Sequence, residues 1–124
     1  NATDDTKAFV AAINDINLLE EQNTPTLIVP SGGIYAISPI NLTSNMILCI
    51  ESGASIVGIM DLTKYPLLPF LPSYGQGEDH PGPRFQSLIH GEHVHNVTMT
   101  GGGILDGQGS YWWAINDQRC CKKL

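Results

Sequence analysis

The stretch TGGGILDGQGSYWW at 100–113 places an acid among glycines, directly before two tryptophans. Glycine-rich loops can bind phosphate, an aspartate beside aromatic rings can act on a sugar, and glycines can also form a structural corner. The stretch lacks the Lys-[Ser/Thr] of a phosphate loop and does not spell G-x-G-x-x-G, which argues against nucleotide binding. Asp106 therefore remains either a catalytic acid or a structural hydrogen-bonding residue.

A second acidic candidate is the adjacent pair Asp4 and Asp5. Two carboxylates are the groups that general acid–base catalysis needs, but adjacent residues entering a helix point in different directions. Both acids also suit the positive end of a helix dipole, and Thr3 can act as the N-cap. We interpret the pair as helix-capping residues and expect no catalysis from them.

Histidines and aromatic residues provide the remaining candidates for chemistry. His90, His93 and His95 form H-x-x-H-x-H, in which the last two share a strand face and could bind zinc or copper. Only Glu92 lies nearby as a further ligand, so we predict surface histidines and no metal site. Three aromatic residues could stack on sugar, although packing against the protein is the favoured interpretation; they are Tyr111, Trp112 and Trp113.

Composition limits the classes of function. The chain has 124 residues, 42% of them hydrophobic, and a net charge of −6, which fits one domain and disfavours a nucleic-acid partner. No apolar run reaches the roughly 18 residues of a transmembrane helix, so no membrane partner is expected. Three cysteines imply no disulfide framework. N-x-[ST] triplets mark possible N-glycosylation at Asn1, Asn41 and Asn96.

The segment 3–22 is the only one with a convincing helical pattern. Phe9, Ile13, Ile16 and Leu19 recur every three or four residues and form one apolar stripe. We therefore predict an amphipathic α-helix.

After this segment the chain repeats itself. The copies are LIVPSGGIYAI at 27–37, LCIESGASIVGI at 48–59 and VTMTGGGILDG at 97–107. Each has two apolar residues two positions apart, then a small pair, glycines and an isoleucine, which is typical of a parallel β-solenoid. An open β-sandwich is the alternative, but the matched order of residue types favours the solenoid. The third copy starts 49 residues after the second, leaving room for an additional turn of chain plus an insertion.

The repeat predicts apolar side chains stacked on one face of the strands: Leu27, Val29, Leu48, Ile50, Val97 and Met99. Aligning the copies puts Asp106 where Ala36 stands in the first, which favours a structural role for this acid. The preceding helix would cover the exposed first coil of the stack. The predicted fold class is therefore all-β, an incomplete parallel β-helix with an N-terminal capping α-helix.

We predict one domain, 1–124, in five parts. Five prolines in the insertion exclude regular helix and central strand, so we expect it to pack on the wall of the solenoid. The parts are the capping helix at 3–22, first coils at 26–59, a proline-rich insertion at 60–86, a further coil at 87–113 and a divergent tail at 114–124.

With these features in place, the sequence resembles the N-terminal part of a plant-type polygalacturonase, glycoside hydrolase family twenty-eight. The matching stretches are TDDTKAFVAAI at 3–13, VPSGGIYAISPINLTSN at 29–45, YPLLPFLPSYGQGEDHPGPRFQSLI at 65–89 and GGGILDGQGSYWW at 101–113. The resemblance implies a right-handed β-helix, secretion to the cell wall, pectic polysaccharide as partner and inverting hydrolysis of α-1,4-galacturonosyl bonds. It implies no cofactor and a monomer for a complete protein.

The family's chemistry resides in Asn-Thr-Asp, Asp-Asp, Gly-His-Gly and Arg-Ile-Lys motifs, and none of these matches here. The sole Asp-Asp is the capping pair, and Arg84 and Arg119 are followed by Phe85 and Cys120. We therefore assign no catalytic residue and expect this chain to be inactive alone. The tail after Trp113 reads as a truncation, with marginal stability expected. The alternatives are a non-catalytic β-helix that binds wall polysaccharide or lacks a function, and, ranked last, a calcium-dependent lyase.

Overall fold

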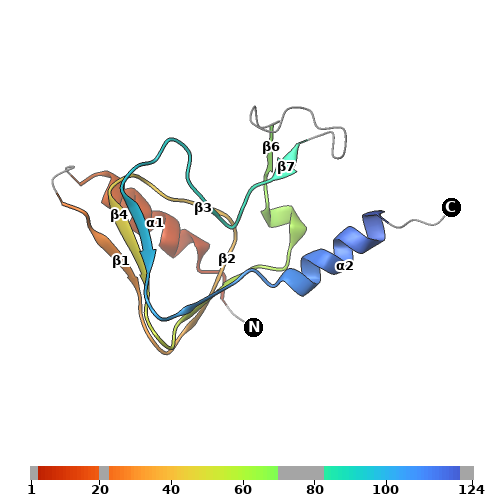
Figure 1. Ribbon diagram of the computed structural model, residues 1–124, viewed down its shortest axis with the longest axis horizontal. Coiled ribbons are helices and arrows are strands. Elements are labelled where there is room, and N and C mark those ends of the chain that lie inside the picture. The colour runs from red at the N-terminus through yellow and green to blue at the C-terminus, as the bar shows by residue number, and fades with distance from the viewer. Residues whose placement is uncertain (1–2, 20–22, 70–82, 121–124) are drawn as a thin grey trace.

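The computed structural model describes residues 3–19, 23–69 and 83–120, the last five of them by their backbone alone. The chain winds through short strands stacked in coils, with one helix against the first coil and a second helix after the last (Figure 1). The strands of the first coil are β1 (Thr26–Val29), β2 (Ile34–Ile37) and β3 (Ile40–Asn41).

The second coil is interrupted by the insertion. It contains β4 (Met46–Ile50) and β5 (Ser55–Gly58), and after the insertion it is completed by β8 (Ile89–His90). The third coil contains β9 (Val97–Thr100) and β10 (Ile104–Asp106).

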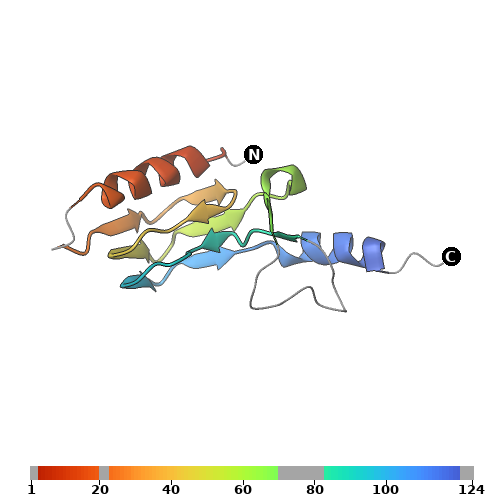
Figure 2. The ribbon, with the colours of Figure 1, turned by 90° about the horizontal axis from the view of Figure 1, so that it is seen from above.

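Strands of successive coils pair in parallel and form three sheets. The strand orders are β1-β4-β9, β10-β5-β2 and β3-β8. Figure 2 shows the coils as layers, with α1 over the first coil and the third coil at the opposite end. The predicted fold, an all-β right-handed parallel β-helix with an N-terminal α-helix, is confirmed.

The register shows how the repeats stack. Leu27 pairs with Leu48, and Leu48 pairs with Met99, so these three side chains form one line through the coils. Met46 pairs with Val97, which corrects our alignment of Leu48 with Val97 by two residues. The predicted face survives this shift because side chains alternate with a period of two. The third copy stacks directly on the second, so the expected additional turn of chain does not lie between them.

The isoleucines of the three copies are not fully equivalent. Ile34 and Ile104 both pair with Ser55, one residue before the Ile56 that we had aligned with them. Ile34 and Ile104 are 67% and 60% exposed and face outward, whereas Ile56 is fully buried. Ile56 pairs with Tyr35 and Leu105, which face the interior line of this sheet.

The core lies between the sheets and α1 (Thr6–Asn17). Its fully buried side chains are Ile37, Ile40, Met46, Leu48 and Ile56. From the helix, Phe9 and Ile13 are buried and join this core, while Ile16 packs partly against it. Leu19, the fourth member of the predicted stripe, is 56% exposed because the helix ends before it.

The helix begins three residues later than predicted. Asp5, not Thr3, is the N-cap residue, and the Asp4 carboxylate accepts a hydrogen bond of 3.1 Å from the Thr6 backbone N–H. The backbone N–H of Asp5 donates to the carbonyl of Ala36, and the Ala36 N–H donates to the Asp5 carboxylate. Asp4 and Asp5 therefore pair with Ala36 of β2, and because their backbone is used in this way the helix begins only at Thr6.

The third corner is tighter than the second. Met46 and Val97 are 51 residues apart, but Ser55 and Ile104 are 49 apart, so the third coil passes the corner with two fewer residues. Gly101 has φ +109°, and a Cβ there would overlap the Ile50 carbonyl. A Cβ on Gly103 would also overlap the second corner. Close backbone approach, in addition to a positive φ, explains the run of glycines.

Two further elements differ from our expectations. A second helix, α2 (Gly109–Cys120), follows the third coil, where we expected the coil to continue to residue 113 and a divergent tail to follow it. Its sequence lacks a clear apolar stripe, which is why periodicity missed it. The described ends of the insertion form a 3-10 turn, η1 (Leu62–Lys64), and an antiparallel pair of β6 (Leu67–Leu68) with β7 (Arg84–Phe85).

Replacing the central leucine of the stack tests the register. Leu48→Ala removes a fully buried side chain between two coils and should lower the free energy of unfolding by about 2–5 kcal/mol. Ile34→Ala, at an outward position, should change it by less than about 1 kcal/mol. Urea denaturation followed by circular dichroism measures both. Equal effects of the two variants would contradict the buried line.

The tight corner yields a separate test with three glycines. Gly101→Ala combines an unfavourable φ with overlap of the Ile50 carbonyl and should cost about 3 kcal/mol or more. Gly32→Ala has φ +89° but open space, so it should show only the smaller backbone strain. Gly107→Ala meets nothing within 4 Å and is the control. Thermal unfolding should rank the losses in this order, and a neutral Gly101→Ala would refute the close approach.

Candidate functional site

Asp106 occupies a structural position at the end of β10. It pairs with Val57, as Ala36 does in the first coil, which confirms the predicted alignment. Its carboxylate accepts a hydrogen bond of 2.8 Å from the Gln108 backbone N–H, and Gln108 has a positive φ of 53°. The Gln108 side chain in turn donates to the Gly58 carbonyl of the second coil. Asp106 therefore fixes the turn into α2.

The aromatic residues after this turn divide into two kinds. Trp112 packs edge-on against Tyr65 at a ring-centroid distance of 4.7 Å and against Tyr111 at 4.9 Å. Its indole N–H donates to the Gly107 carbonyl at 3.0 Å. Trp113 is 67% exposed and makes none of these contacts. Wall packing, the favoured interpretation, holds for Trp112, while Trp113 is the ring available to stack on a ligand.

Burial against this cluster changes the acidity of Tyr65. Desolvation raises the pKa of its phenol, and the nearby Tyr111 adds to the increase. The neutral phenol is therefore favoured in the folded protein.

The three histidines do not converge. His93 and His95 lie in the loop between β8 and β9, not on the shared strand face that we expected. His95 Nδ1 lies 3.3 Å from the Ser44 hydroxyl, and His90 Nδ1 lies 3.5 Å from the Ser87 hydroxyl. Among the described residues, no group of three or more His, Cys, Asp or Glu side chains could hold a metal ion.

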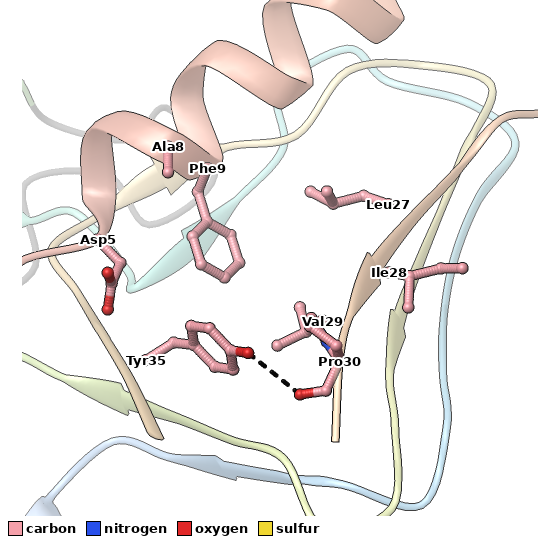
Figure 3. Close-up of a pocket in the computed structure, with 8 residues that line it drawn as sticks. All are labelled: Asp5, Ala8, Phe9, Leu27, Ile28, Val29, Pro30 and Tyr35. Carbon is pink, nitrogen blue, oxygen red and sulfur yellow. Dashed lines mark hydrogen bonds between the residues drawn. The ribbon is translucent and has the colours of Figure 1, made fainter. Parts of the chain in front are cut away.

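An apolar cavity of about 200 Å³ opens between α1 and the first coil (Figure 3). Phe9 and Tyr35 form one side as an edge-on pair at 6.4 Å, and Leu27 and Val29 of β1 form the other. The Tyr35 hydroxyl donates to the Pro30 carbonyl, so the cavity contains little free hydrogen-bonding capacity. It suits packing between the helix and the stack more than recognition of a polar sugar.

A second cavity, of about 220 Å³, lies where the C-terminal end of α1 meets the turn before β4. Its lining is polar, with amides, hydroxyls and an imidazole; it includes Asn17, Asn23, Thr43, Ser44, Asn45 and His95. The Thr43 hydroxyl donates to the Asn17 amide oxygen at 2.7 Å. Sequence reasoning missed this site, because its residues come from segments up to about eighty positions apart and share no motif.

Two asparagines stack on each other in the turns that precede β4 and β9. Asn45 and Asn96 have φ angles of 58° and 54°, so the same left-handed turn recurs in the second and third coils. The Asn96 amide nitrogen donates to the Asn45 amide oxygen at 3.0 Å and to the Thr24 hydroxyl at 3.3 Å. Asn96 was a candidate glycosylation site from sequence, and the structure gives it a structural role. Asn1 lies outside the described residues.

Two aspartates have a pKa below the usual range and are not suited to donate a proton. Hydrogen bonds from the Thr6 hydroxyl and N–H lower the pKa of Asp4, and Lys64, at 3.1 Å, lowers it further. Thr63 lowers the pKa of Asp61 in the same way. A general acid needs the opposite change. Asp4 and Asp61 are therefore not suited to act as a general acid.

The chain is similar in sequence to part of a longer known protein. A protein of Vitis vinifera named "probable polygalacturonase" is 35% identical over 109 residues, which are 87% of this chain. The chain is similar to polygalacturonases. It covers only 22% of that relative's length, so the similarity concerns one part of a longer protein. No protein-family model matches.

Solved structures agree with the sequence comparison. A family 28 exopolygalacturonase from Yersinia enterocolitica superimposes on 86% of this chain with TM-score 0.69 and 25% identity. An exopolygalacturonase from Thermotoga maritima superimposes on 98% of it with TM-score 0.71 and 27% identity. The chain spans 18% and 26% of these two proteins.

No helix in the described ranges is long and apolar enough to cross a membrane.

The two tryptophans allow a matched test of the polygalacturonase-like segment. Trp112→Ala should lower the free energy of unfolding by about 2 kcal/mol or more, because it removes the contacts with Tyr65 and Tyr111. Trp113→Ala should change it by less than about 0.5 kcal/mol, because that ring is exposed. Denaturant titration measures both variants. A larger loss for Trp113→Ala would reverse the assignment of these rings.

Proposed function

We propose that this chain is the N-terminal segment of a pectin hydrolase that cleaves α-1,4-galacturonosyl bonds with inversion. The observation that carries the proposal is the 35% identity to a probable polygalacturonase over 87% of the chain. The parallel coils and the fit to two exopolygalacturonase structures support the same conclusion. Extracellular action on pectic polysaccharide in the cell wall belongs to the proposal.

The role of the segment is structural within that enzyme. It supplies the helix that covers the first coil and the sheets on which later coils would continue. Inverting hydrolysis needs one carboxylic acid to protonate the leaving oxygen and one carboxylate to activate water, about 6.5–9.5 Å apart. Asp61 and Asp106 instead accept hydrogen bonds that hold turns. By itself the chain should therefore release no product.

A second candidate is a non-catalytic β-helix that binds wall polysaccharide. The exposed ring of Trp113 and the polar cavity lined by amides and hydroxyls favour it, because both suit contact with sugars. The charge of −6 opposes it, since polygalacturonate is acidic and Lys64 is already paired with Asp4.

A chimera distinguishes these functions. Residues 3–113 replace the aligned segment of the Thermotoga maritima exopolygalacturonase, and reducing ends released from polygalacturonate are measured for the chimera, the parent and this chain alone. We expect hydrolysis by the chimera and none by the chain alone. Unsaturated products, which report elimination, should be absent.

The control is the same chimera with Leu48→Ala, which should lower its melting temperature because the stack is weakened. A folded chimera without activity would contradict the proposed role in a hydrolase. Product release by the chain alone would contradict the statement that its own residues lack the chemistry. Retention of the chain on immobilised pectin, together with an inactive chimera, would support the binding module.

A further inference from the structure

We propose that Asn41 is an N-glycosylation site of this protein and that Asn96, in an equally matching triplet, is reserved for a structural hydrogen-bond network. The inference rests on the proposed function only in requiring passage through a secretory pathway. The two acceptor triplets are Asn41-Leu42-Thr43 and Asn96-Val97-Thr98, and neither has proline in the middle.

The chemistry requires the side-chain amide nitrogen to be free. The nitrogen forms a bond to the anomeric carbon of an oligosaccharide that is activated as a lipid diphosphate. The carbon–oxygen bond to the diphosphate breaks, the lipid diphosphate leaves, and one amide proton is released. The modified amide retains only one of its two N–H donors.

Asn96 has no donor to give up. One N–H bonds the Asn45 amide oxygen at 3.0 Å and the other bonds the Thr24 hydroxyl at 3.3 Å. These bonds connect the third coil to the second coil and to the segment before β1. Asn96 is exposed, as Asn41 is, but a glycan on its nitrogen would remove one of these two hydrogen bonds. Its left-handed backbone, φ 54°, matches that of Asn45 and maintains this stacking.

Asn41 has the opposite arrangement. It is exposed at the end of β3, and its amide oxygen accepts a hydrogen bond of 2.7 Å from the side chain of the buried Gln86. Because the oxygen faces Gln86, the planar amide turns its nitrogen the other way. Among the described residues no hydrogen bond involves this nitrogen. Gln86 thus orients the acceptor group without occupying the atom that reacts.

The position also leaves the growing end of the stack clear. Asn41 lies in the first coil, the one against which α1 packs, and β9 and β10 lie at the far end of their sheets. A glycan there would not obstruct pairing of a further coil with those strands.

The experiment uses the full chain secreted from a eukaryotic host by an added signal sequence. Enzymatic release of glycans in ¹⁸O water, followed by peptide mass spectrometry, reports the occupancy of each asparagine. We expect label at Asn41 and none at Asn96. Glycan on Asn96 in the folded protein, or an unmodified Asn41, would overturn the proposal.

Three variants separate modification from structure. Asn41→Gln should remove one glycan from the intact mass, whereas Thr98→Val, which abolishes the second triplet but keeps the Asn96 amide, should leave the mass unchanged. Asn96→Gln should lower the melting temperature by about 4 °C or more, because coil-to-coil hydrogen bonds are lost.

These measurements test the roles of Asn41 and Asn96 without any assay of pectin hydrolysis, so they can fail while the proposed function holds. If Asn96→Gln melts like the wild type, the network is not structural and the inference fails. If Asn96→Gln does not accumulate while Thr98→Val does, the structural requirement at Asn96 is supported. A mass loss in Thr98→Val would show that Asn96 carries a glycan and would overturn the assignment.

Discussion

The in-register stacking of interior side chains from one coil to the next is the interaction on which the rest of the structure depends. Leu48 is fully buried because Leu27 covers it from one coil and Met99 from the other. Met99, which has a coil on one side only, is 45% exposed, and Leu105 is 44% exposed for the same reason. Each coil thus gains burial only from its neighbours, as in other repeat proteins.

Stacking of side chains places a demand on the backbone at each corner. The interior side chains of successive coils stack only if the strand after each corner pairs in register with the strand of the neighbouring coil. This holds even where one corner has fewer residues than the other. The third corner achieves this with two fewer residues by bringing Gly101 and Gly103 against the backbone of the second. The glycines and the aspartate of 100–113 therefore serve one purpose, since Asp106 then fixes the turn by which the chain leaves the stack.

Sequence alone predicted the features that repeat and the features that alternate. The apolar face of Leu27 and Leu48, the matching of Asp106 to Ala36 and the covering helix all follow from periodicity. It could not predict that the second and third copies are offset by 51 residues in one sheet and 49 in another, because glycine-rich corners absorb such differences without an apolar signal. Helix α2 lacks an apolar stripe, and the polar cavity is lined by residues far apart in the sequence, so no local pattern predicts either of them.

Similar residues acquire different roles according to their place in the stack. Asn41 and Asn96 carry the same acceptor motif, yet only Asn96 occupies the left-handed turn that recurs between coils, where both amide protons are used. Trp112 and Trp113 are adjacent, yet only Trp112 reaches Tyr65. In a β-helix, a motif therefore acquires its meaning from the position it takes in the coil, and contacts to neighbouring coils decide which copy is free for chemistry.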